Sequence, residues 1–126
     1  MAVVLVVEDD SDLREELVCL LEDWAHTVRM AANGQEALTL LRNDSSIDVV
    51  LLDLMMPGLD GWTLRQKLLR TPGLDRIPVV VVSGVGDLNQ EDRDLQAAAV
   101  LTKPFDLDQL AGVLSNLGLH AIPSSP

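Results

Sequence analysis

The sequence is poor in aromatic and basic residues. It contains no tyrosine and one phenylalanine, and nine lysines and arginines stand against twenty aspartates and glutamates. A chain with a net charge of -11 repels the phosphate backbone of a nucleic acid, and it offers few rings on which bases could stack. We therefore expect no direct contact with DNA or RNA.

The sequence also has a single cysteine, Cys19, and no long hydrophobic run. One cysteine cannot form an internal disulfide, which fits a reducing compartment, and a free cysteine is most often packed as an apolar residue. The opening MAVVLVV lacks a basic residue, unlike a secretory signal, and no apolar run is long enough to span a bilayer. We expect a soluble, cytoplasmic protein without membrane contact, and we expect His26 and His120 to be solvated.

Five short runs of aliphatic residues alternate with segments of helical spacing. The runs predict strands at residues 2–7, 27–31, 48–52, 77–82 and 99–102. The segments between them predict helices that begin near Asp10 or Ser11, after Asn33, and at about Asp60, Leu88 and Asp106. This alternation predicts an α/β fold, a parallel sheet in a doubly wound (βα)5 sandwich. The predicted domain spans residues 1–118, and residues 119–126 predict a C-terminal tail or truncated linker.

The first two predicted helices carry more detailed signals. In the first, the expected apolar stripe is Leu13, Leu17, Leu20 and Trp24, and Arg14, Glu15, Glu22 and Asp23 are expected to face away from it. In the second, Asn33 precedes Glu36 by three residues, which predicts a capping box at the start of the helix.

Polar residues follow four of the five predicted strands. They are Glu8, Asp9 and Asp10 after the first, Asp53 after the third, Ser83 (followed by Gly84) after the fourth, and Lys103 (followed by Pro104) after the fifth. In an open α/β sheet, ligands bind outside the carboxyl ends of the strands. Acids in such loops are often helix caps, but Pro57 and Gly58 follow Asp53 too closely for that reading. Together these residues predict a functional site at one rim of the sheet.

Carboxylates that lie close together repel one another unless a cation joins them. Carboxylate oxygens, waters and a substrate phosphate are the usual ligands of Mg²⁺. An ammonium and a hydroxyl opposite them suit the oxygens of a phosphoryl group. In-line phosphoryl transfer needs mainly positioning and charge neutralisation, so this set can transfer a phosphoryl group onto a carboxylate. Asp53 is the predicted nucleophile, and the product would be an acyl phosphate.

Four motifs resemble the receiver domain of two-component response regulators. They are VLVVEDD (4–10), DVVLLDLMMPGLDGW (48–62), VVVVSG (79–84) and LTKPF (101–105), and the resemblance covers about residues 2–118. It implies a flavodoxin-like sheet with strand order 2-1-3-4-5. It also implies a protein of a phosphorelay that is phosphorylated by a histidine kinase or a histidine phosphotransfer protein. Such a protein is a phosphoacceptor, not an enzyme, although it assists its own phosphorylation and slow dephosphorylation.

The resemblance also implies roles for single residues. Asp53 accepts the phosphoryl group, and the implied Mg²⁺ ligands are Asp9, Asp53, the backbone carbonyl of Met55 and, through water, Glu8. Ser83 is the hydroxyl that turns toward the phosphoryl group, Lys103 is the cation that contacts it, and Gly84 keeps the approach open. The Lys103–Pro104 peptide bond is expected to be cis, which aims Lys103 at the site.

The sequence departs from the family pattern on the face that relatives use for output, formed by helix four, strand five and helix five. Val100 stands where an aromatic residue usually rotates inward with the hydroxyl. The interval from Ser83 to Lys103 is shorter than usual and carries the acidic stretch GDLNQEDRD (86–94). We expect the loop after Ser83 and a short fourth helix to respond to phosphorylation in place of a ring.

Two other functions fit parts of the pattern. A degenerate receiver would act only as a protein-interaction module, but here every residue that handles phosphate is present. A haloacid-dehalogenase-type phosphatase also uses an aspartate nucleophile, yet it requires a second acid two residues later, where this chain has Met55.

Overall fold

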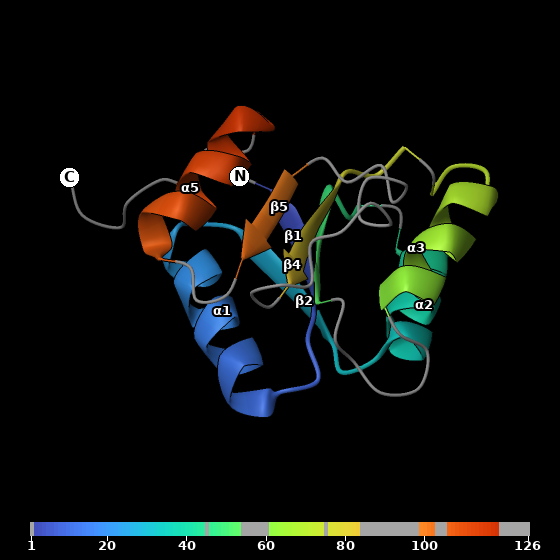
Figure 1. Cartoon of the computed structure of the whole chain (residues 1–126), viewed down its shortest axis with the longest axis horizontal. Coiled ribbons are helices and arrows are strands. Elements are labelled where there is room, and N and C mark those ends of the chain that lie inside the picture. The colour runs from blue at the N-terminus through green and yellow to red at the C-terminus, as the bar shows by residue number, and fades with distance from the viewer. Residues whose placement is uncertain are drawn as a thin grey trace.

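The computed structural model describes residues 2–44, 46–53, 61–74, 76–83, 99–102 and 106–118. The strands are β1 (Val3–Val7), β2 (Thr27–Ala31), β3 (Val49–Asp53), β4 (Val79–Ser83) and β5 (Ala99–Thr102). The described helices are α1 (Ser11–Asp23), α2 (Gly34–Asn43), α3 (Gly61–Arg70) and α5 (Leu107–Asn116). The strands form one sheet, with α1 and α5 on one face and α2 and α3 on the other (Figure 1).

The sheet is entirely parallel, and its order is β2-β1-β3-β4-β5. This order confirms the flavodoxin-like fold that the resemblance implied. The chain passes from β1 to β2 on one side and then crosses back to β3 on the other side of β1. The switch point therefore lies between the carboxyl ends of β1 and β3, where Val7 pairs with Leu52.

The core consists of two layers, one on each face of the sheet. On the face covered by α2 and α3, the buried side chains include Leu5, Val7, Val50, Leu52, Ala37, Leu38, Leu41 and Leu68. On the face covered by α1 and α5, they include Val4, Val6, Val49, Leu51, Leu17, Leu21, Leu110 and Leu114. Successive residues of a strand point to opposite faces, so strands buried on both sides must be apolar throughout. The edge strand β2 is the exception, because most of its side chains are at least partly exposed.

Helix α1 differs in detail from the expected amphipathic pattern. Leu17 and Leu21 are the buried pair, while Leu20 and Trp24 are only partly buried. Cys19 is exposed, so the expectation of a packed cysteine was wrong. At about 100° per residue, position 19 lies about 200° around the helix from Leu17, on the side away from the core.

Side-chain caps define the beginnings of three helices. Asp10 caps α1 by accepting hydrogen bonds from the amides of Asp12 (3.0 Å) and Leu13 (3.2 Å). Asp106 caps α5 and forms a reciprocal capping box with Gln109. The box predicted for α2 is altered: Asn33 accepts from the amide of Glu36, but the Glu36 carboxylate accepts from the amide of Ala32 (2.8 Å) instead of Asn33. The Glu36 side chain therefore bonds to the amide one residue before the N-cap, and not to the N-cap amide as in a standard capping box.

His26 is buried, with 4% of its surface exposed, so the expectation of a solvated turn histidine was wrong. Ala25 has a positive φ of 68°, and the amide of His26 donates to the carbonyl of Leu21 (3.0 Å), as in a Schellman turn. This turn folds His26 back under the end of α1. Its Nδ1 accepts a hydrogen bond from the amide of Ala2 (3.2 Å), and its Nε2 is buried without a partner in the described part of the chain.

We predict that His26 makes the folded protein less stable in mild acid. Burial lowers the pKa of His26 from its ordinary value of 6.5, so the unfolded chain takes up this proton at a higher pH than the folded protein does. The free energy of unfolding should then fall as the pH drops below 6.5, by at most about 1.4 kcal/mol per pH unit. His26→Asn should remove this part of the pH dependence, and His120→Asn should keep it. Urea unfolding at several pH values measures both, and equal slopes for wild type and His26→Asn would contradict the account.

Some expectations fall outside the described residues. These are the fourth helix at about residues 88–96 and the tail at residues 119–126. The third and last helices and the fifth strand lie where the sequence predicts them. The third strand extends one residue further than expected, so that Asp53 is its last residue. Among the described residues, no helix combines the length and the hydropathy needed to cross a membrane.

Candidate functional site

The end of β1 places two carboxylates at the switch point. The amide of Glu8 donates to the carbonyl of Ala31 (3.1 Å), so the hydrogen bonding between β1 and β2 continues through Glu8. The Glu8 side chain is 2% exposed, whereas Asp9 is exposed. One Glu8 carboxylate oxygen accepts from the amide of Asp10 (3.2 Å), at the cap of α1. The cap of α1 and the orientation of Glu8 are therefore coupled.

Asp53 is the third carboxylate of the site, and β3 positions it. It follows four buried aliphatic residues and is itself 4% exposed. In the sheet it pairs with Val82 of β4. A carboxylate is rarely buried to this extent without a charge partner or a function. Asp53 is paired with β4, and the residue before it, Leu52, is paired with both β1 and β4, so the sheet backbone positions its carboxylate at the rim.

The three carboxylates meet as the sequence predicted. Glu8, Asp9 and Asp53 each offer an oxygen, and these oxygens lie within 4.8 Å of one another. Three hard oxygen donors, two of them on buried residues and one on an exposed residue, suit a small divalent cation that keeps several waters. The donor set therefore fits Mg²⁺, with Asp9 on the solvent side of the site.

The other predicted site residues are described only in part. Ser83 is the last residue of β4, one position beyond the partner of Asp53, and its backbone pairs with Thr102 at the end of β5. Val100 lies in β5 and is 39% exposed. Met55, Gly84, Lys103 and the Lys103–Pro104 bond fall outside the described residues.

Arg14 is a residue of the site that sequence reasoning missed. It was expected to face away from the protein, but its guanidinium reaches back and donates to the backbone carbonyl of Glu8 (2.9 Å). This bond ties the first turn of α1 to the chain that carries Glu8 and Asp9. The helical pattern alone contains no signal for it, because a long arginine side chain on a polar face can turn toward either solvent or protein.

Comparison with known proteins agrees with this geometry. A sequence profile described as the response regulator receiver domain matches residues 4–115. The chain belongs to the response regulator receiver family. Response regulator MprA of Mycolicibacterium vanbaalenii is 38% identical over 109 residues, which are 85% of this chain and 46% of that protein. The Gliding motility regulatory protein of Myxococcus xanthus is 35% identical over 96 residues, which are 76% of this chain and 12% of that protein. The receiver chain thus spans half or less of the length of these two relatives.

Solved receiver structures share the fold over almost the whole chain. A response regulator receiver protein from Pseudomonas putida superposes with a TM-score of 0.85 at 26% identity, covering 91% of this chain and 96% of that chain. The chemotaxis protein CheY4 of Vibrio cholerae superposes with a TM-score of 0.84 at 27% identity, covering 92% and 98%. This receiver domain is therefore consistent with a role in two-component signalling.

Proposed function

We propose that this receiver accepts a phosphoryl group on Asp53 from a phosphohistidine of a partner protein. The observation that carries the proposal is a nearly buried carboxylate at the end of β3, within 4.8 Å of two further carboxylates at the switch point of a receiver fold. The Asp53 carboxylate attacks phosphorus, the bond between phosphorus and the donor nitrogen breaks, and the donor imidazole takes up a proton. The product is an acyl phosphate on Asp53.

Mg²⁺ is the proposed cofactor, held by Asp9 and Asp53 directly and by Glu8 through water, with the backbone carbonyl of Met55 as a further ligand. When bound, the ion neutralises the charge of the carboxylates and of the incoming phosphoryl oxygens. The exposure of Asp9 and the burial of Glu8 support this division between a direct and an indirect ligand. Glu8 already accepts from the amide of Asp10, which fixes its carboxylate behind the site.

The remaining side chains are assigned by their places in the chain. Lys103, directly after β5, contacts the phosphoryl group with its ammonium, and a cis Lys103–Pro104 bond directs it there. Ser83 at the end of β4 donates its hydroxyl to another phosphoryl oxygen, and Gly84 leaves room for the donor. The parallel pairing of β3, β4 and β5 supports these roles, because it places the ends of the three strands side by side.

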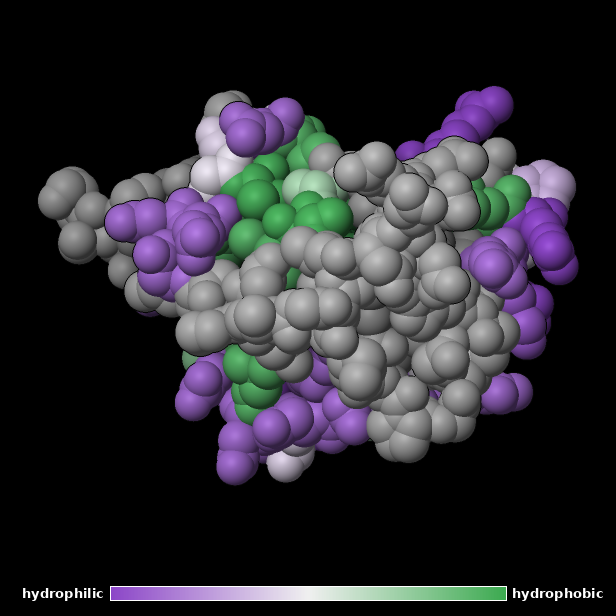
Figure 2. All heavy atoms as spheres, viewed as in Figure 1, coloured by the Kyte–Doolittle hydropathy of each residue, from purple (hydrophilic) through white to green (hydrophobic). Residues whose placement is uncertain are grey.

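The proposed partners are a histidine kinase or histidine phosphotransfer protein and an output domain or protein. Two relatives are named probable transcriptional regulators, and their chains continue beyond the matched region. In Figure 2, hydrophobic side chains gather over α5 and β5, where Val100 is exposed. An apolar surface of this kind supports output through β5 and α5. Phosphorylation would act on it through Ser83 and the segment that follows.

Labelling with a small phosphodonor tests the proposal against its two alternatives. Purified protein is incubated with radiolabelled acetyl phosphate and Mg²⁺, and both bound label and released phosphate are followed over time. The proposal predicts label that stays on the protein and decays slowly. Absence of label would favour a pure interaction module, and sustained multiple turnover without label would favour a phosphatase.

A further inference from the structure

Asp9 is the exposed carboxylate of the cluster, and hydrogen bonds hold the backbone on either side of it. On one side, Nη1 of Arg14 donates to the carbonyl of Glu8 (2.9 Å). On the other side, the amide of Asp10 donates to the Glu8 carboxylate (3.2 Å), and the carbonyl of Asp10 accepts from the amide of Arg14 (2.9 Å). Packing gives an exposed side chain little support, so the position of the Asp9 carboxylate depends mainly on these backbone contacts.

Arg14 takes part in two of these bonds, and only one of them depends on its side chain. The bond from its amide to Asp10 is an ordinary bond of an α-helix, which almost any residue would form. The bond from its guanidinium to Glu8 closes the loop between β1 and α1. The carboxylate of Asp10 holds the same turn by accepting from the amides of Asp12 and Leu13. The first turn of α1 and the backbone around Asp9 are therefore one hydrogen-bonded unit.

The charge of Arg14 and its hydrogen bond act on the carboxylate cluster in opposite directions. The guanidinium brings a positive charge close to the cluster, and this charge repels a divalent cation. The hydrogen bond supports the arrangement in which oxygens of Glu8, Asp9 and Asp53 lie within 4.8 Å of one another. Because Arg14 is partly exposed, water and salt screen its charge, whereas groups that support metal ligands commonly change the affinity by about ten- to a hundredfold. Positioning should therefore outweigh repulsion.

We propose that Arg14 is a positioning residue of the magnesium site, whose guanidinium holds the backbone of Glu8 so that Asp9 faces the ion. This inference rests on the proposed function, because it requires that the carboxylate cluster binds Mg²⁺. The same bond joins the site to α1, so ion binding and the order of the first turn of α1 are coupled. Such a coupling acts equally in both directions. Mg²⁺ should therefore stabilise the first turn of α1, and loss of the bond should weaken the binding of Mg²⁺.

Calorimetric titration of the full chain with Mg²⁺ tests the proposal through Arg14→Met, which keeps the aliphatic stem but removes the donor and the charge. The dissociation constant should rise about tenfold, the lower end of the range for groups that support metal ligands. At saturating Mg²⁺, the rate of labelling by acetyl phosphate should return to the wild-type value, because Asp53 is unchanged. Arg42→Met is the control, since Arg42 is an exposed arginine in the last turn of α2, outside the cluster. This control removes the same charge and should change the dissociation constant by less than about twofold.

Amide hydrogen exchange measures the coupling between the ion and α1. The amides of Asp12 and Leu13 report on the first turn, because both donate to the Asp10 carboxylate. Saturating Mg²⁺ should slow their exchange in the wild type and should slow it less in Arg14→Met. An arginine that only stabilised the fold would change exchange equally with and without the ion. Circular dichroism checks that the variant is folded, and Arg14→Gln is a second neutral variant for the same measurements.

The direction of the change in affinity separates the alternatives. An unchanged dissociation constant in Arg14→Met, or the same change in Arg42→Met, would overturn the proposal. A lower dissociation constant would also overturn it, because Arg14 would then act only through its charge. Failure of the proposed function has a different signature, since the wild-type chain itself would then bind no Mg²⁺ saturably and acquire no label from acetyl phosphate.

Discussion

Asp53→Asn is expected to abolish phosphoryl uptake from a phosphorylated histidine kinase and from acetyl phosphate. An amide has the shape of the carboxylate but lacks the negatively charged oxygen that attacks phosphorus. Asp53 is 4% exposed and sits at the end of a fully buried strand, so the isosteric change avoids a packing defect. Intact-protein mass spectrometry after incubation with acetyl phosphate and Mg²⁺ measures the outcome as the fraction of chains that gain one phosphoryl group.

Asp48→Asn is the matched control for this prediction. The substitution removes the same charge as Asp53→Asn does, but Asp48 lies at the other end of β3. There its carboxylate accepts a hydrogen bond from the amide of Val3 (2.8 Å). It is exposed and takes no part in the carboxylate cluster. This variant should be phosphorylated as the wild type is. Equal uptake by Asp53→Asn and Asp48→Asn would show that the acceptor lies elsewhere.

Asp9→Asn is expected to raise the dissociation constant for Mg²⁺ by about ten- to a hundredfold, the size of effect seen even for groups that only support metal ligands. Asp9 is the exposed member of the cluster, so its replacement leaves the core intact. Phosphorylation at limiting Mg²⁺ should slow by a similar factor and recover at high Mg²⁺. Calorimetric titration measures the affinity directly, and the rise in melting temperature with added Mg²⁺ provides a second readout.

Asp12→Asn provides the comparison for the magnesium measurement. Asp12 is an exposed acid in the first turn of α1, close in sequence to Asp9 but outside the cluster. Its replacement lowers the net negative charge by the same amount, so it corrects for any general attraction of cations to an acidic protein. A magnesium titration that Asp9→Asn and Asp12→Asn change equally would remove Asp9 from the proposed ligands.

The meeting of Glu8, Asp9 and Asp53 could be predicted because two simple patterns determine it. Aliphatic runs separated by helical segments predict parallel strands, and the carboxyl ends of parallel strands share one rim. Acids directly after two such runs must then lie at that rim. The order of the strands is a different matter. The hydrophobic pattern contains no information on the strand order, which was inferred from the resemblance of the motifs to known receivers.

The features that sequence reasoning missed depend on tertiary contacts of single residues. His26 is buried because Ala25 adopts a left-handed conformation, which local sequence does not favour for alanine. The hydrogen bond from Arg14 to the carbonyl of Glu8 joins the two ends of the loop between β1 and α1. The helical pattern does not predict it, because several rotamers of arginine are compatible with that pattern. The prediction for Cys19 relied on the usual burial of free cysteines. In the structure Cys19 lies on the side of α1 that faces away from the core, so it is exposed.

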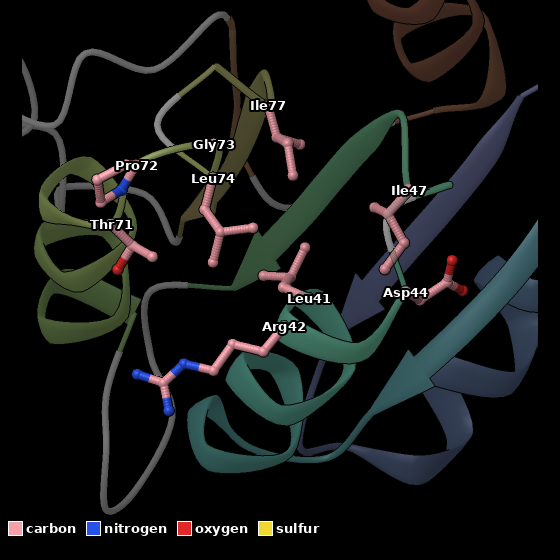
Figure 3. A pocket seen from close by; sticks show the side chains of 9 residues that line it. All are labelled: Leu41, Arg42, Asp44, Ile47, Thr71, Pro72, Gly73, Leu74 and Ile77. Atoms are coloured by element: carbon pink, nitrogen blue, oxygen red, sulfur yellow. The ribbon is translucent and has the colours of Figure 1, made fainter.

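A pocket of about 360 Å³ between the ends of α2 and α3 could not be predicted from the sequence either (Figure 3). Its apolar lining combines Leu41 from the end of α2, Ile47 from the segment before β3, and Leu74 and Ile77 from the segment before β4, and each of them is an ordinary apolar residue in the sequence. Only the folded chain places Arg42 and Asp44 beside them.

Chemical mapping of the phosphorylated residue tests the central claim most directly. An acyl phosphate on aspartate is reduced by borohydride to homoserine, whereas an unmodified carboxylate is not. Protein treated with acetyl phosphate and Mg²⁺ is reduced, digested and sequenced by tandem mass spectrometry. The account predicts homoserine at position 53 alone, dependent on Mg²⁺ and on prior phosphorylation. Homoserine at another aspartate, or none in protein shown to carry the phosphoryl group, would contradict it.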